Sequence, residues 1–288
     1  MPGEWAISYP GTDLVFGDAS GIHLSTHPEL GPVNRTVDDA DLPRTDGVVM
    51  GVDYVGGQAI GLSFGIDGKT EADVRAKYGL LTSVWDAPTV RGKAGALAEL
   101  VSDTGRRAYG RPRRFAPTAF DLWSSYIRAV ADFETVDRHW YGPVDHEASV
   151  SIVPPAGGGL VAPLASPLTT TRSSDRSTVL EVGGEVPTWP VFTVQGPITN
   201  PVVEIVGLLR LEFNLTLAYD QSLVIDTRPG RRTILRGTGS VAGALRRTST
   251  RLVNASVPPG RYELVLRGTS APGTSRVSMR WRDAFPNP

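Results

Sequence analysis

A nine-residue alternation in the second half of the chain constrains its fold more than any other feature. Residues 209–217 place leucine or phenylalanine at every odd position and a polar residue at every even one. A period of two puts the large apolar side chains on one face of a strand. Shorter alternations occupy 223–225, 262–266 and 277–281, and turns rich in proline and glycine separate them. The pattern predicts an antiparallel β-sandwich for the second half.

The first half also predicts strands, together with one short helix. Large apolar residues at 60, 62, 64 and 66 alternate with small ones, and Gly56-Gly57 before them indicates a hairpin turn. Residues 97–114 indicate a second hairpin about Thr104-Gly105, and 127–133 a further strand. Thr70, with Asp73 three residues later, predicts the start of a helix over 70–81. Five residues are expected in the two cores: Leu62, Phe64, Leu211, Phe213 and Met279.

Charge and composition divide the chain into two parts. Residues 1–150 carry 14 basic and 21 acidic residues, whereas residues 151–288 carry 15 and 9. The segment 154–167 is rich in proline, glycine, alanine and serine, which is typical of a linker, although a long surface loop within one domain would look the same. We therefore predict two domains, 1–153 and 154–288.

Composition excludes several classes of protein and site. The chain has no cysteine, which rules out disulfides, thiolate metal sites and a cysteine nucleophile. No run approaches the roughly 18 apolar residues that a membrane-spanning helix needs. The N-terminus lacks the pattern of a secretory signal. The basic second half has little aromatic interleaving and no dense basic stripe, so nucleic-acid recognition is not indicated. The densest basic run, at 106–114, is compatible with nucleic acid or a membrane surface, and equally with the carboxylates of a partner protein.

Candidate catalytic motifs are few, and their context argues against each one. Residues 61–65 match the G-x-S-x-G pattern around Ser63, but they lie inside an alternating strand rather than at a strand-to-helix turn. Residues 237–243 lack the helix that a phosphate-binding loop requires. His139 and His146 have acidic neighbours, but a solvated loop explains them better than a metal site. We predict no catalytic residue, no cofactor and no metal.

Several segments resemble the C-terminal domain of siphophage distal tail proteins, which are often described as minor tail proteins in phages of actinobacteria. A P-T-x-P segment, a short β run at 191–194 and a G-P-x-T-N-P segment follow one another between 187 and 201. The first half matches more diffusely at 46–53, 110–113 and 132–141, and Asp137-Arg138 stands where the family commonly has Asp-Pro. The motif residues are Pro187, Thr188, Trp189, Pro190, Gly196, Pro197, Thr199, Asn200, Pro201 and Asp226.

The resemblance implies a mainly β protein with an N-terminal split-barrel domain, related to tail-tube proteins, and a C-terminal galectin-like sandwich. It implies a structural ring, usually hexameric, that joins the tail tube to the baseplate hub at the virion tail tip and lets DNA pass. No enzymatic activity, membrane insertion or sequence-specific nucleic-acid binding is implied. The missing cysteines and signal fit assembly in the host cytoplasm, and an acidic first half fits a channel through which DNA slides.

Two other functions are kept as alternatives. A carbohydrate-binding module for host-surface glycans would use Trp189 and Trp281 as a stacking platform, although Trp281 is in phase with Val277 and Met279 and is therefore better read as core. A hydrolase would need Ser63 or a carboxylate pair such as Asp132 and Glu134.

Overall fold

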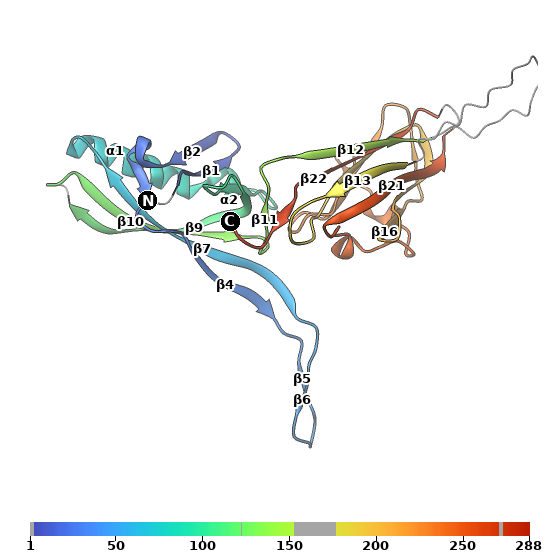
Figure 1. The fold of residues 1–288 in the computed structure, drawn as a ribbon, viewed down its shortest axis with the longest axis horizontal. Helices are drawn as coiled ribbons and strands as arrows, with labels where there is room; N and C mark the ends of the chain where they lie inside the picture. The colour runs from blue at the N-terminus through green and yellow to red at the C-terminus, as the bar shows by residue number, and fades with distance from the viewer. Residues whose placement is uncertain (1–2, 122, 153–176, 271–272) are drawn as a thin grey trace, which may run out of the picture. The chain divides into compact units, whose positions relative to one another are not determined.

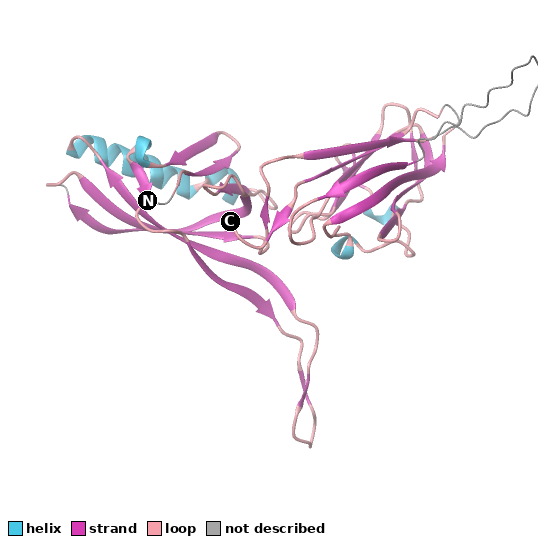
Figure 2. Cartoon of the chain, viewed as in Figure 1, coloured by secondary structure: helices cyan, strands magenta, loops and turns pink. Residues whose placement is uncertain are grey.

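The computed structural model describes residues 3–121, 123–152, 177–270 and 273–288. It is mainly β, which confirms the fold class expected from the sequence (Figures 1 and 2). The chain forms two compact units, unit 1 (Met1–Pro143 with Phe285–Pro288) and unit 2 (Val144–Ala284). These ranges differ from 1–153 and 154–288 because residues 146–151 pair with a strand of unit 2, while the last four residues belong to unit 1. The linker predicted at 154–167 lies outside the described residues.

Unit 1 contains one large antiparallel sheet with the strand order β2-β1-β8-β9-β10-β7-β3, in which β4 and β11 also pair with β7 and β9, and a separate two-stranded sheet of β5 and β6. Its strands are β1 (Trp5–Tyr9), β2 (Thr12–Phe16), β3 (Ile22–Leu24), β4 (Glu29–Thr36), β5 (Ala40–Asp41), β6 (Val48–Val49), β7 (Tyr54–Asp67), β8 (Ala98–Val101), β9 (Arg107–Asp121), β10 (Tyr126–Thr135) and β11 (Trp140–Tyr141). The hairpin predicted about Thr104-Gly105 is confirmed as β8 and β9. Its helices are η1 (Asp18–Ser20), α1 (Glu71–Asp86) and α2 (Pro88–Arg91).

Helix α1 begins where the sequence predicts and covers one face of the sheet (Figure 2). The Thr70 hydroxyl accepts a hydrogen bond from the backbone N–H of Asp73 at 3.2 Å, which satisfies one of the free donors of the first turn. Val74 and Leu81 are fully buried against the strands. The helix runs one turn beyond the predicted end and brings Trp85 edge-on to Phe64, with ring centroids 5.7 Å apart. This layer of helix on sheet forms the core of unit 1.

The hairpin turn predicted at Gly56-Gly57 is wrong. Both glycines lie inside β7, which is 14 residues long, and the chain turns instead between β5 and β6. A Cβ atom at position 57 would collide with the backbone carbonyl of Thr135. Glycine is therefore needed here for the close approach of two chain segments and not for a positive φ angle.

Unit 2 consists of two antiparallel sheets around a second core. The six-stranded sheet has the order β12-β22-β14-β18-β19-β20, and the other has the order β13-β21-β15-β16, with β17 also paired to β15. The strands are β12 (His146–Ser151), β13 (Ser177–Val182), β14 (Val191–Gln195), β15 (Ile198–Ile205), β16 (Leu209–Glu212), β17 (Thr216–Leu217), β18 (Ser222–Asp226), β19 (Thr233–Arg236), β20 (Gly239–Ser240), β21 (Gly260–Thr269) and β22 (Arg276–Trp281), with short helices η2 (Ala242–Ala244) and η3 (Leu252–Asn254). The last strand, β23 (Ala284–Phe285), belongs to the sheet of unit 1. All five predicted core residues are buried.

The strand predicted over 209–217 is broken into β16 and β17, so its continuity is a second correction. The neighbouring strand β15 carries an irregularity between Thr199 and Val202, where Asn200 adopts a φ of 50°. Facing it, the Phe213 N–H bonds to Pro201 O, but the Asn214 N–H turns away to Ala244 O. The alternation of buried side chains survives the break, because Leu211, Phe213 and Leu217 all remain in the core.

Candidate assembly surface

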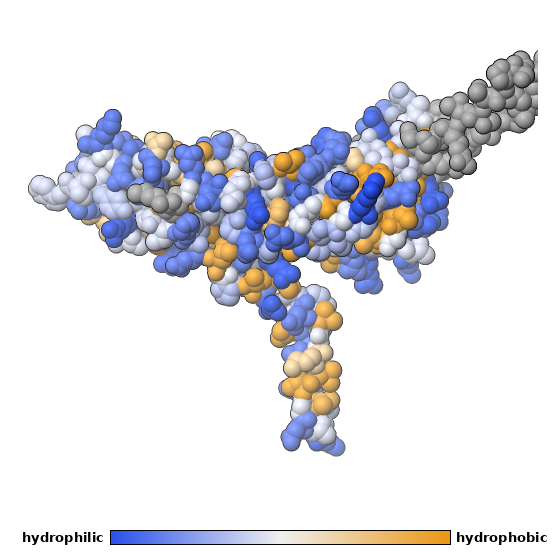
Figure 3. All heavy atoms as spheres, viewed as in Figure 1, coloured by the Kyte–Doolittle hydropathy of each residue, from blue (hydrophilic) through white to orange (hydrophobic). Residues whose placement is uncertain are grey.

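A long hairpin extends from the sheet of unit 1. Strands β4 and β7 continue beyond the other strands and lead into the short pair β5 and β6 (Figure 1). The Leu42 N–H bonds to Gly47 O at 3.3 Å and closes the loop. We call residues 37–53 the arm. Its exposed apolar side chains, visible as an orange group in Figure 3, are Val37, Leu42, Val48, Val49, Met50 and Val52. So many exposed apolar residues on a thin projection indicate a surface that another chain covers.

A buried polar cluster holds the base of the arm. The Thr135 hydroxyl accepts from the Gln58 N–H at 3.0 Å and donates to Asp137 O at 2.5 Å. The Asp137 carboxylate in turn accepts from the His139 N–H at 2.9 Å and from the Tyr141 hydroxyl at 2.8 Å. These bonds tie β7, where it leaves the sheet, to the connection between β10 and β11.

Burial controls the ionisation of this cluster. Desolvation raises the pKa of Asp137 above its usual value, although the bonds from His139 and Tyr141 act in the opposite direction. Desolvation likewise lowers the pKa of His139, against the attraction of the Asp137 charge. The cluster therefore resists having both side chains charged.

The variant Asp137→Asn is expected to remove a pH dependence of stability. A raised pKa means that the folded chain binds this proton more tightly than the unfolded chain does, so the free energy of unfolding falls as the pH rises from about 4 through the folded pKa. Asparagine retains an acceptor oxygen but has no charge to desolvate. We expect the variant to gain stability relative to wild type between pH 4 and 7, by about 1.4 kcal/mol for each unit of the raised pKa.

Urea denaturation of both proteins at pH 4 and pH 7 measures this effect. His139 is present in both chains, and its titration differs between them through the loss of the Asp137 charge, which raises the pKa of His139 in wild type. A stability difference that is equal at the two pH values would contradict the assignment.

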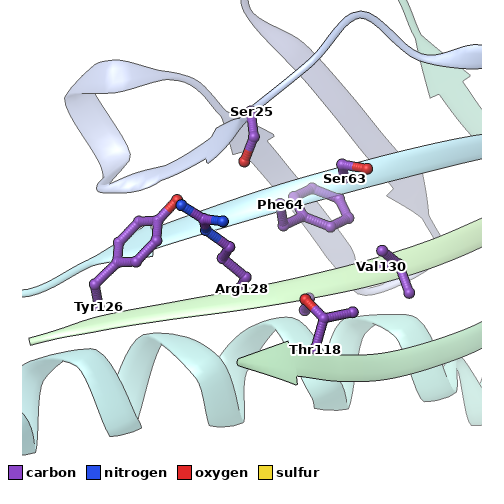
Figure 4. A pocket seen from close by; sticks show the side chains of 8 residues that line it. Ser25, Ser63, Phe64, Thr118, Tyr126, Arg128 and Val130 are labelled. Carbon is purple, nitrogen blue, oxygen red and sulfur yellow. The ribbon is translucent and has the colours of Figure 1, made fainter. Parts of the chain in front are cut away.

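The sheet face opposite α1 is lined by small residues and carries a shallow pocket beside β3, β7 and β10. Figure 4 shows Arg128 and Tyr126 side by side there, with Ser25 and Ser63 nearby. The Arg128 guanidinium lies 5.5 Å from the centre of the Tyr126 ring. Within the described part of the chain, no carboxylate forms an ion pair with Arg128. The pocket provides one cation and several hydroxyls.

The structure separates the candidate catalytic residues. Ser63 lies inside strand β7, as the alternation predicts, and no hydrogen bond joins it to His23, which pairs instead with Asp67 at 3.2 Å between Nδ1 and Oδ2. His139 belongs to the arm base, while His146 stacks on Trp281 with ring centroids 5.4 Å apart. Among the described residues, no group of three or more histidine, aspartate or glutamate side chains is placed to hold a metal ion.

The basic run and the tryptophan pair are also explained by local packing. Arg107 pairs with Glu99 and Arg113 with Glu134, each at 2.7 Å between nitrogen and oxygen. Trp281 is buried, as its phase in the strand predicts, and Trp189 is half-buried. No helix in the described ranges is long and apolar enough to cross a membrane.

Comparison with solved structures gives matches over nearly the whole chain. The Dit protein (gp 19.1) of phage SPP1, described as a paradigm of the hub adsorption apparatus in phages that infect Gram-positive bacteria, aligns with a TM-score of 0.56 at 13% identity, covering 98% of this chain and 99% of that one. The chain has the fold of a phage distal tail protein. A chain of the phage P2 baseplate in its activated conformation with calcium matches with a TM-score of 0.54 at 13% identity, covering 98% of each chain. The strontium form of that baseplate gives 0.51 at 13% identity, covering 97% of each.

Comparison of the amino-acid sequence with protein-family models and with curated proteins gives no match to set beside the structural likeness. No family model matches the chain, and no curated protein does. The likeness is therefore carried by the arrangement of strands and not by detectable sequence identity.

Several motif residues of unit 2 form hydrogen bonds between the loops that connect its strands. Thr188 is fully buried, exchanges two backbone hydrogen bonds with Val257 and donates its hydroxyl to Arg282 O at 2.6 Å. Pro190 O accepts the Thr227 hydroxyl at 2.6 Å, and Pro197 O accepts the Ser275 hydroxyl at the same distance.

The remaining motif residues are turn and register positions. A Cβ at Gly196 would collide with the Ala218 carbonyl, and the Thr199 hydroxyl lies 3.2 Å from that of Thr216. Asn200 and Pro201 form the irregularity of β15, and Asp226 pairs with Arg228 at 2.6 Å. Each of these contacts supports the fold of unit 2. That these residues constitute the motif of the distal tail family stays a prediction.

Sequence reasoning missed the arm and one exposed aromatic pair. The arm was missed because the hairpin turn was predicted at Gly56-Gly57, whereas the chain turns between β5 and β6. Phe120 and Trp123 are exposed near the end of the β9–β10 hairpin. The residues two positions to either side of Trp123, Asp121 and Ser125, are polar, and this was the available signal for the exposure of Trp123.

Proposed function

We propose that this chain is a structural protein of a phage tail tip, without enzymatic activity, whose copies close into a ring between the tail tube and the baseplate hub. The observation that carries the proposal is the two-unit fold shared over almost the full length of both chains with the SPP1 Dit protein, which is described as belonging to a hub adsorption apparatus. A chance resemblance of one common β domain would not extend through both units.

The arm supports a ring of identical copies. A closed ring needs two different, complementary surfaces on each copy, because each interface joins the front of one copy to the back of the next. The arm offers an exposed apolar projection for one of these surfaces. We propose six copies, with a galectin-like unit 2 outside the ring and assembly in the host cytoplasm.

The charge of unit 1 supports passage of DNA through the ring. Its residues carry 19 acidic and 14 basic side chains. An excess of carboxylates limits binding to phosphates, whereas a basic wall would retain DNA. Mapping charge on an assembled ring tests this point, and a mainly basic channel would contradict it.

Light scattering and negative-stain microscopy of the purified chain test the ring. We expect a particle near six times the 30.8 kDa chain mass with a central hole. A chain that remains monomeric at all concentrations would overturn the proposal. A monomer whose binding to glycans is lost in Trp189→Ala would favour the carbohydrate-binding alternative.

A further inference from the structure

Unit 2 contains a long stretch of basic residues without acidic neighbours. From residue 227 to residue 262 the chain has eight arginines and no aspartate or glutamate. Two of these arginines have acidic partners from outside the stretch: Arg228 pairs with Asp226, and Arg246 pairs with Glu212. Six exposed arginines of this stretch form no ion pair with any described residue. Five of them precede η3, namely Arg231, Arg232, Arg236, Arg247 and Arg251, and we call these five the arginine edge. The sixth, Arg261, lies in β21 and is not part of it.

The arginine edge lies where both sheets of unit 2 end. Strands β19 and β20 close one sheet, and β16 closes the other. The segment after β20 bonds to strands at the ends of both sheets. The Val241 N–H bonds to Ile234 O in β19, and the Arg246 N–H bonds to Glu212 O in β16. The Thr250 N–H then bonds to Arg210 O, so the segment runs antiparallel to β16. Arg236, Arg247 and Arg251 therefore lie along this margin, and Arg231 and Arg232 lie in the turn that leads into β19.

Apolar residues flank this margin. The segment continues into η3, where Val253 is exposed, and β16 is preceded by Leu208, which is also exposed. The margin thus combines unpaired positive charge with accessible apolar surface, a combination that suits an amphipathic acidic partner.

The arm has the opposite charge and the same mixed character. Residues 37–53 contain five aspartates and a single arginine. Asp53 pairs with Arg35, but Asp38, Asp39, Asp41 and Asp46 form no ion pair with a described residue. In Figure 3 the orange group of the arm lies above blue atoms at its tip.

We propose that the arm of one copy docks on the arginine edge of a second copy. The four aspartates face the arginines, and the arm's valines and Met50 cover the apolar flank of the margin. Both surfaces are exposed in the single chain, so a second copy is the partner that supplies each with its complement. The contact would link the arm of each copy to the outer unit 2 of another copy, in addition to the contacts within the ring itself, and it rests on the proposed ring.

A charge exchange tests the pairing in the full-length chain. The edge variant is Arg231→Glu/Arg232→Glu/Arg247→Glu, and the arm variant is Asp38→Arg/Asp41→Arg/Asp46→Arg. Asp39 is left unchanged because it accepts the Gly51 N–H at 2.8 Å within the arm. Sedimentation velocity over a concentration series measures association, and circular dichroism checks that each variant is folded.

We expect each variant alone to weaken association at least tenfold, and the chain carrying both sets to recover to within about threefold of wild type. The control Arg261→Glu/Arg276→Glu reverses two exposed arginines of the same unit away from the edge, and it should associate as wild type does. Association of wild type should also weaken as salt rises, because exposed charges are screened.

The outcomes separate this proposal from the proposed function. If wild type forms rings and the edge variant does so equally well, the ring stands and this contact is wrong. If both single variants fail and the combined chain fails as badly, the two surfaces do not face each other. An edge variant that assembles normally but loses binding to heparin would assign the arginines to a polyanion instead. A wild-type chain that never associates overturns both proposals.

Discussion

Val49→Ser/Met50→Ser in the arm is expected to leave the chain folded but largely monomeric. Both side chains are exposed in the single chain, at 53% and 79%, so serine removes no packing from unit 1. If they are buried in a neighbouring copy, each contributes about 1.5–3 kcal/mol to the interface. The pair would then weaken each contact about 100-fold or more. Light scattering at micromolar concentration should show the shift from ring to monomer.

The matched control is Val179→Ser/Tyr219→Ser in unit 2. These two side chains have the same exposures, 53% and 79%, but lie on β13 and in the β17–β18 turn. We expect the control to assemble as wild type does, and both variants to keep the wild-type melting temperature. Rings that form equally well with the serine arm would mean that the arm's apolar surface has another occupant.

Phe213→Ala is expected to destabilise unit 2 by about 3–5 kcal/mol. Phe213 is fully buried and lies at the junction where the chain leaves β16, with its N–H bonded to Pro201 O. Removing the ring leaves a cavity that the surrounding strands, held by their backbone hydrogen bonds, can only partly close. A loss of this size is a large fraction of the stability of an ordinary domain.

Thermal or urea denaturation followed by circular dichroism measures the loss. Tyr219→Ala, at an exposed position of the same unit, should change stability by no more than about 0.5 kcal/mol. A Phe213→Ala protein that melts at the wild-type temperature would contradict the burial of this side chain.

Local pattern was enough to predict most strands and the residues that form the two cores. The small and large faces of β7 follow directly from the alternation of glycine and serine with Leu62 and Phe64. The helix start at Thr70 could be predicted because its cap is made by residues three positions apart. In each case the interacting groups are close in sequence, or one face of a strand is buried throughout.

The sequence also determined the division of charge between the two halves, and the resemblance at 187–201 led to the prediction of the distal-tail fold. Tertiary structure alone decided which glycines bend the chain. Gly57 is required by Thr135, 78 positions away, and the break after β16 is imposed by an irregularity in β15. It also decided which arginines have carboxylate partners and which do not. These outcomes depend on contacts between distant segments, whose energies a local pattern does not contain, and so the arm and the arginine edge became visible only in the folded chain.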